Sequence, residues 1–90
     1  LDTDSMDQLM AILQGREVYF VTVHNADGED TEVNSYIKDT ARRYPNAHVI
    51  DWQAYQVGHP EWYVSDGVHH NEVGTLHYVA FIARSLYQQR

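Results

Sequence analysis

Cysteine is absent from this 90-residue chain, so neither a disulfide framework nor a thiolate metal site is available to it. No apolar run approaches the ~20 residues that a membrane-spanning helix needs. Cations are also scarce, and the net charge is -7 with neutral histidines. This charge argues against nucleic acid or an anionic membrane surface as a partner. The length suits one small domain.

The opening residues, LDTDSMDQ, are acidic and lack the basic start of a signal peptide. We therefore expect the sequence to begin inside a longer protein. A helix follows over residues 4–15, with Ser5 as its cap, Gln8 completing an S-x-x-Q capping box and Gly15 ending it. Its predicted apolar stripe consists of Met6, Leu9, Met10 and Leu13.

Strands and helices alternate after this point. Residues 17–23 (EVYFVTV) form a continuous apolar run rich in β-branched and aromatic residues, which predicts a strand. Asp27-Gly28 predicts a turn, and residues 47–52 (AHVIDW) a second short strand. Between the strands, a helix begins at Asp30 or Thr31 and ends at Pro45; it buries Val33, Ile37, Ala41 and Tyr44.

The final helix is predicted to open at Asn71 and to turn Leu76, Val79, Ala80, Ala83 and Leu86 inward. Residues 53–70 show no clear period. Alternating helices and strands imply a parallel sheet with right-handed crossovers. Two parallel strands alone leave two open edges and do not make a stable sheet. We therefore expect the second half of a larger α/β domain, completed by preceding sequence, a partner chain or a swapped copy.

Asp66 and His69 stand three residues apart, with Gly67 between them, just before the last helix. A turn can bring the carboxylate to the imidazole Nδ1, which fixes the tautomer and leaves Nε2 free to take a proton from a serine hydroxyl. The alternative is a helix-entry turn in which Asp66 and Asn71 accept hydrogen bonds from backbone N–H groups. The spacing alone favours the second reading, because D-x-x-H is short and common.

A family resemblance changes that balance. The succession VYFVTV, VNSYIKDTARRYPNAHVIDW and GHPEWYVSDGVHHNEVGTLHYVAFIARSL resembles the C-terminal half of the SGNH-hydrolase fold, and within it the extracytoplasmic domain of peptidoglycan O-acetyltransferases and other acyltransferase-3 proteins. The resemblance implies the C-terminal portion of a three-layer α/β/α, flavodoxin-like domain with parallel strands over residues 1–90, without an internal boundary and incomplete without its N-terminal half. It also implies that Asp66 orients and His69 acts as general base in a Ser-His-Asp triad; His70 is given no role.

The early G-D-S segment of that family, which carries the nucleophile, and the glycine and asparagine of its oxyanion hole are missing here. No serine of this chain (Ser5, Ser35, Ser65, Ser85) has the strand-to-turn setting that exposes a nucleophile. The fragment alone is therefore expected to be inactive. The resemblance implies an O-acetyltransferase, or an acetylesterase if water takes the acetyl group. It implies no cofactor or metal, and an acetylated or acetyl-accepting polysaccharide as substrate. The expected place is the outer face of the bacterial cell membrane or the cell wall, with a membrane link only through a preceding domain.

Large aromatic residues have two readings. Trp52 and Trp62, with Tyr63, could floor a carbohydrate cleft by stacking, and core packing is an equally good interpretation. Among the polar residues, we expect Asp51 to cap or support the fold, Asn34 to lie at the surface or in a cap, and His59 to serve loop structure. Arg42 and Arg43 are expected to form a solvated helix end.

Two other function classes stay open. Six histidines and thirteen acids could form a metal-binding module, but no H-x-x-x-H or H-E-x-x-H pair is present, so a preformed zinc site is weakly supported. A non-catalytic half-domain could also assemble with a partner through its bare sheet edge.

Overall fold

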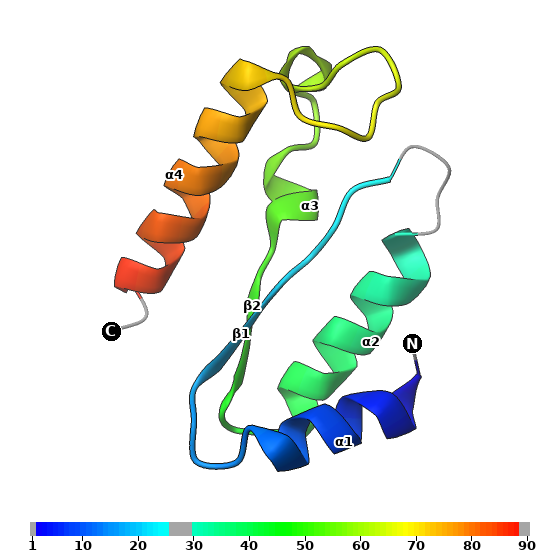
Figure 1. The fold of residues 1–90 in the computed structure, drawn as a ribbon, viewed down its shortest axis with the longest axis vertical. Coiled ribbons are helices and arrows are strands. Elements are labelled where there is room, and N and C mark those ends of the chain that lie inside the picture. The colour runs from blue at the N-terminus through cyan, green and yellow to red at the C-terminus, as the bar shows by residue number, and fades with distance from the viewer. Residues whose placement is uncertain (1, 26–29, 89–90) are drawn as a thin grey trace.

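The computed structural model describes residues 2–25 and 30–88, and the turn predicted at Asp27-Gly28 lies outside them. In chain order the elements are α1 (Thr3–Ile12), β1 (Val18–Val21), α2 (Asp30–Arg43), β2 (Ala47–Ile50), α3 (Trp52–Tyr55), the 3-10 turn η1 (Pro60–Trp62) and α4 (Glu72–Gln88), as Figure 1 shows. The predicted alternation is therefore confirmed. The short helical pieces α3 and η1, in the stretch without a period, were not predicted.

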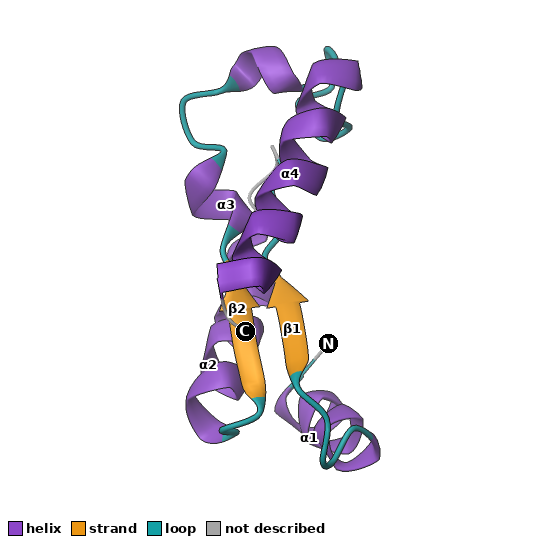
Figure 2. Ribbon diagram, turned by 90° about the vertical axis from the view of Figure 1, so that its left-hand side faces the viewer, coloured by secondary structure: helices purple, strands orange, loops and turns teal. Residues whose placement is uncertain are grey.

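The two strands pair in parallel, with Val18 opposite Ala47 and Val21 opposite Ile50. Figures 1 and 2 place α2 on one face of this sheet and α4 on the other. The mixed α/β architecture and the parallel pairing thus agree with expectation. No third strand joins the sheet within the described residues, so both of its edges are open there.

Helix α1 begins one turn earlier than its predicted cap. Asp2 is the N-cap residue, and its carboxylate accepts a hydrogen bond from the Ser5 backbone N–H at 2.8 Å. The assignment of Ser5 as the cap is wrong, because Asp2 offers a charged acceptor three residues before that N–H. Met6 and Met10 are buried as predicted, whereas Leu9 is exposed.

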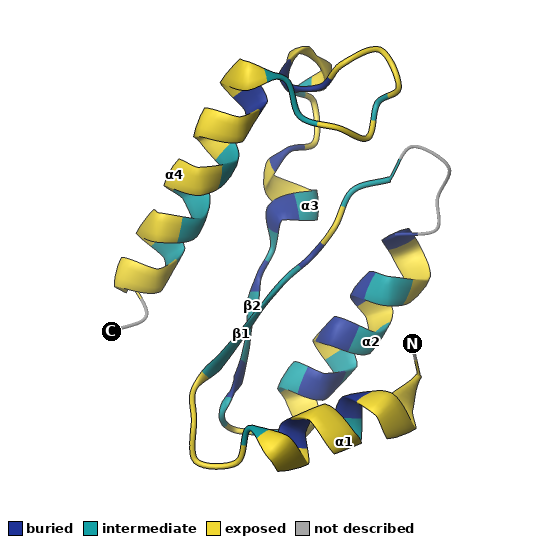
Figure 3. Ribbon diagram, in the orientation of Figure 1, coloured by how far each residue is buried: buried dark blue, intermediate teal, exposed yellow. Residues whose placement is uncertain are grey.

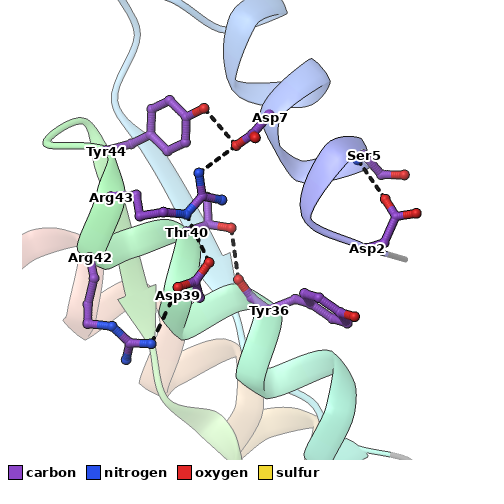
Figure 4. A network of polar contacts seen from close by, with 9 residues as sticks. All are labelled: Asp2, Ser5, Asp7, Tyr36, Asp39, Thr40, Arg42, Arg43 and Tyr44. Carbon is purple, nitrogen blue, oxygen red and sulfur yellow. Dashed lines mark hydrogen bonds and ion pairs between the residues drawn. The ribbon is translucent and has the colours of Figure 1, made fainter.

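A polar network joins the exposed faces of α1 and α2 (Figure 4). Arg43 donates to Asp7 at 2.7 Å and to Asp39 at 2.9 Å, and the Tyr44 hydroxyl donates to the same Asp7 oxygen at 2.8 Å. Arg43 is exposed in the last turn of α2, as predicted, and it also connects two helices, which the sequence did not show. Arg42, with one contact of 3.5 Å to Asp39, matches that prediction better.

The aromatic part of the core lies against α4, and other buried residues, among them Met10, Ile37 and Ile50, belong to α1, α2 and β2. Trp52, Trp62 and Tyr63 form the buried centre of the aromatic part, and three partly buried residues, Val21, Tyr78 and Phe81, pack against them. Tyr78 and Phe81 come from α4, so the last helix packs against the short helical segments η1 and α3.

The inward face predicted for α4 is wrong. Leu76 and Val79 are 67% and 59% exposed, and the face turned to the core carries Gly74, Tyr78 and Phe81 instead (Figure 3). The rotation of the helix follows from the close approach of Gly74 to the backbone of Trp62, which only a residue without a side chain permits. The outer face of α4 is therefore apolar and uncovered in this chain.

Searched over its described residues, the chain has no helix that combines the length and apolar character needed to cross a bilayer.

Candidate functional site

The segment between η1 and α4 folds back on itself as a tight loop. Tyr63 and His70 form an antiparallel bridge at its base, and the Val64 N–H donates to the His69 carbonyl at 2.9 Å. The tip turns at Gly67, whose φ of 73° lies in the left-handed region that favours glycine. The loop thus has a defined shape set by its own backbone hydrogen bonds.

Asp66 uses its two carboxylate oxygens for different purposes. Oδ1 accepts hydrogen bonds from the N–H groups of Val68 at 2.8 Å and His69 at 3.0 Å, while Oδ2 lies 2.5 Å from His69 Nδ1. One oxygen therefore accepts hydrogen bonds from the backbone of the turn, and the other contacts the imidazole.

The geometry leaves the far side of the imidazole open. A carboxylate partner at Nδ1 favours the tautomer with hydrogen on that nitrogen, so Nε2 carries the free lone pair. The His69 side chain is 79% exposed, and no group in the described part of the chain is hydrogen-bonded to Nε2. The imidazole can therefore accept a proton from a group brought to it.

The electrostatics of the pair are also defined. The hydrogen bond from His69, followed by those from the backbone N–H groups of His69 and Val68, lowers the pKa of Asp66 to about 2. The carboxylate is therefore ionised at neutral pH.

The loop lies beyond the carboxyl ends of β1 and β2 (Figure 1). In parallel sheets, binding and catalytic sites gather at this end of the strands. Asp51, directly after β2, caps α3 through the Ala54 N–H and accepts from the Thr22 hydroxyl at 2.9 Å. Thr22 also accepts from the Gln53 N–H at 2.9 Å. Asp51 therefore supports the fold, as predicted.

Both tryptophans of the expected stacking platform lie in the core. Trp52 is 1% exposed and Trp62 is 5% exposed. The ring of Trp62 stacks on His59 at 3.9 Å and on His77 at 4.4 Å between ring centroids. This burial supports the core-packing interpretation of Trp52 and Trp62, and the two histidine rings cover the faces of Trp62. His59 serves loop structure, as predicted, and contacts Glu61.

A groove of about 510 Å³ lies beside the loop, and Ser65 and Gly67, the two neighbours of Asp66, both line it. Its polar side chains come from His24, Gln53, Gln56, His59, Tyr63 and Ser65. The described residues that line it include no Asp, Glu, Lys or Arg, although the chain as a whole is acidic. The groove suits a neutral, hydrogen-bonding ligand.

Three supporting residues were missed or misplaced from the sequence. Asn34 is buried instead of exposed; its Oδ1 accepts from the Val23 N–H at 2.8 Å and its Nδ2 donates to the Val23 carbonyl at 2.9 Å. The buried hydroxyl of Thr22 joins the two strand ends, and His70 packs into the aromatic core. These long-range contacts have no local sequence signature.

The other candidate groups are dispersed. No three histidine, aspartate or glutamate side chains converge on a possible metal position in residues 2–25 and 30–88. Ser65 is exposed beside Asp66, and the Ser85 hydroxyl donates to the Phe81 carbonyl within α4.

The comparisons with known proteins agree with the resemblance seen in the sequence. The chain is 24% identical over 83 residues to O-acetyltransferase OatA of Staphylococcus aureus, and 30% identical over 79 residues to peptidoglycan O-acetyltransferase OatA of Listeria monocytogenes. This chain is a relative of the OatA O-acetyltransferases. It is also 31% identical over 71 residues to a putative O-acetyltransferase of Staphylococcus aureus.

These matches cover 92%, 88% and 79% of this chain but only 14%, 12% and 12% of the respective relatives. The chain thus corresponds to a small part of each OatA-like protein. No protein-family model matches it.

Proposed function

We propose that this chain is the C-terminal half of an SGNH-type domain in a peptidoglycan O-acetyltransferase, and that it supplies the Asp-His pair of a Ser-His-Asp triad. In this proposal Asp66 orients and His69 is the general base, and the serine belongs to sequence outside residues 1–90. The single observation that carries the proposal is the 2.5 Å contact of Asp66 Oδ2 with His69 Nδ1, which leaves Nε2 open beyond the carboxyl ends of two parallel strands.

The chemistry runs in two steps. Nε2 of His69 takes the serine proton as the serine oxygen attacks the acetyl carbonyl, and the protonated ring returns that proton to the departing donor group. A sugar hydroxyl then gives its proton to Nε2 and attacks the acetyl-serine, which releases the serine oxygen to be reprotonated by the imidazolium. Water in place of the sugar makes the same site an esterase. The ionised Asp66 favours both imidazolium states.

The uncovered surfaces of this chain support the half-domain part of the proposal. Apolar residues recur at helical spacing along the outer face of α4, and the sheet has two open edges in the described chain. The exposed apolar residues of α4 are Val73, Leu76, Val79, Leu86 and Tyr87. The relatives are several times longer than this chain, so their remaining sequence is the natural source of the covering layer.

The groove beside Asp66 is the best place in this chain for part of the polysaccharide. Its size falls within the ~300–1,000 Å³ of small-molecule sites, and its polar lining suits hydroxyl and amide groups. The substrate of such an enzyme lies outside the membrane, so we place this domain on the outer face of the bacterial cell membrane or in the cell wall.

A serine-directed fluorophosphonate tests the function in the intact protein. The nucleophile is expected to label rapidly, and His69→Gln to slow labelling and acetyl transfer by roughly 10²–10⁴-fold, because general-base help is lost. His48→Gln is the matched control, since His48 also contacts a carboxylate, Glu17, at 2.5 Å but lies at the opposite end of the sheet.

Equal labelling of the His69→Gln and unaltered proteins would remove His69 from the mechanism. A protein with no reactive serine at all would instead favour the alternative function, a non-catalytic half-domain that assembles through its open sheet edge and the outer face of α4.

A further inference from the structure

His70, the residue after the proposed base, points in the opposite direction from its neighbour. Its ring packs against Trp52 with 5.3 Å between centroids, against Tyr63 at 5.1 Å and against Tyr78 at 4.8 Å. These rings come from α3, from the end of η1 and from α4. One side chain therefore anchors the loop to three elements of the fold.

The anchor acts directly on the backbone of the proposed base. His70 forms the antiparallel bridge with Tyr63, and the carbonyl of His69 accepts from the Val64 N–H at 2.9 Å. With the ring of His70 turned inward and its backbone paired, the preceding side chain must point outward. This arrangement sets where His69 meets Asp66.

The surroundings of His70 suit a neutral ring. Trp52 (α3), Tyr63 (after η1) and Tyr78 (α4) offer no negative charge, and His69 precedes it in the loop. His24, which follows β1, and His70 both line a cavity of about 150 Å³. The nearest carboxylate to His24 is that of Asp30 in α2, whose Oδ2 is 3.8 Å from His24 Nδ1.

Burial, with His24 and His69 as smaller causes, lowers the pKa of His70. The aromatic faces would attract a cation, but that attraction does not outweigh the lost hydration and the two neighbouring imidazoles. Because the folded-state pKa is lowered, the packed loop is fully stable above the ordinary histidine pKa. That stability is lost progressively as the pH falls below it.

We propose that His70 is a positioning residue for the Asp66–His69 pair, and that its ring holds the loop in place only while it is neutral. This inference rests on the proposed function. It adds a second imidazole that must be unprotonated for activity, besides the base itself.

The acid side of the pH profile of kcat/KM for a soluble acetyl ester, measured on the intact protein, tests the inference. In the unaltered protein the slope of log kcat/KM against pH should steepen from about 1 to about 2 as the second imidazole is protonated. His70→Phe keeps an aromatic ring but cannot be protonated, so its slope should stay near 1. His77→Phe is the matched control, because His77 also stacks on a core ring but lies outside the loop; its slope should steepen as in the unaltered protein.

A second readout does not depend on turnover. The proton shared by His69 Nδ1 and Asp66 should give a downfield NMR resonance, sharp at pH 7.5 in the unaltered protein and His70→Phe. It should be broadened or lost in His70→Ala, where the anchor is gone. Circular dichroism checks that each variant is folded.

A slope of about 1 throughout in the unaltered protein, or the same steepening in His70→Phe, would overturn the inference, as would a sharp resonance in folded His70→Ala. These failures leave the proposed function intact, whereas full activity of His69→Gln would remove the proposed function itself.

Discussion

Gly74 of α4 lies against the backbone carbonyl of Trp62 at the end of η1. A β-carbon placed on Gly74 would be 1.9 Å from that oxygen and 2.8 Å from its carbon. Asn71 ties the same two segments together: its N–H donates to the Trp62 carbonyl at 2.9 Å, and its Oδ1 accepts from the Gly74 N–H at 2.8 Å. The loop with Asp66 and His69 is closed by this junction.

Gly74→Ala should therefore destabilise the intact domain by about 3 kcal/mol or more, because the added methyl group overlaps backbone that cannot move aside. The measurement is the free energy of unfolding from denaturant titration. Thr75→Ala, at the next and exposed position of α4, should change it by less than about 0.5 kcal/mol. Equal stability of the two variants would show that α4 can separate from η1 at little cost.

The link between Asp66 and His69 predicts a pH response. NMR titration of the Asp66 carboxyl carbon should give a midpoint near 2, and His69→Gln should raise it toward the ordinary aspartate value, because the largest cause of the lowered pKa is the His69 hydrogen bond. A lowered pKa stabilises the loop above the ordinary aspartate value, and that contribution is lost only as the pH falls from about 4 toward about 2.

His59→Gln is the matched control for this titration. His59 contacts Glu61 at 2.8 Å and lowers the pKa of that carboxyl, so the substitution should raise the pKa of Glu61 and leave Asp66 unchanged. An Asp66 midpoint that does not respond to His69→Gln would mean that the side-chain contact is not formed in solution.

Asn34 supports the end of β1 through its pair of hydrogen bonds with Val23. Asn34→Ala leaves both backbone groups unpaired and should destabilise the domain by roughly 1–3 kcal/mol, measured as the free energy of unfolding. Ser35→Ala changes the adjacent, exposed position and should have an effect below about 0.5 kcal/mol. A neutral Asn34→Ala would show that water replaces the side chain without loss.

Features that depend on residues close together in the sequence were predicted correctly. The D-x-x-H turn and the Asn71 cap depend on residues three positions apart, and both formed as expected. The parallel pairing of β1 and β2 followed from the alternation of helices and strands. Each of these features is encoded within one element or one crossover.

Contacts between residues far apart along the chain could not be predicted from the sequence. Arg43 meets Asp7 across 36 positions, and Asn34 reaches Val23 across 11, so neither partner is visible locally. Trp52 and Trp62 could belong to a core or a cleft, and only the surrounding rings show which. The outer stripe of α4 was predicted to face inward because an apolar stripe indicates burial without naming the partner that covers it.

That stripe gives the last prediction, which concerns the missing half of the domain. If the rest of the parent protein covers α4, Leu76 is exposed in this chain but buried in the intact protein. Leu76→Lys should then destabilise the intact domain by at least about 2 kcal/mol, since the buried leucine side chain is replaced by a charge. In the isolated chain the same substitution should reduce binding of a hydrophobic dye, because Leu76 is 67% exposed there. Thr75→Lys, on the flank of the stripe, should change the stability of the intact domain by less than about 0.5 kcal/mol. A stable, fully active Leu76→Lys protein would mean that the outer face of α4 stays in water, and the half-domain proposal would lose its main structural support.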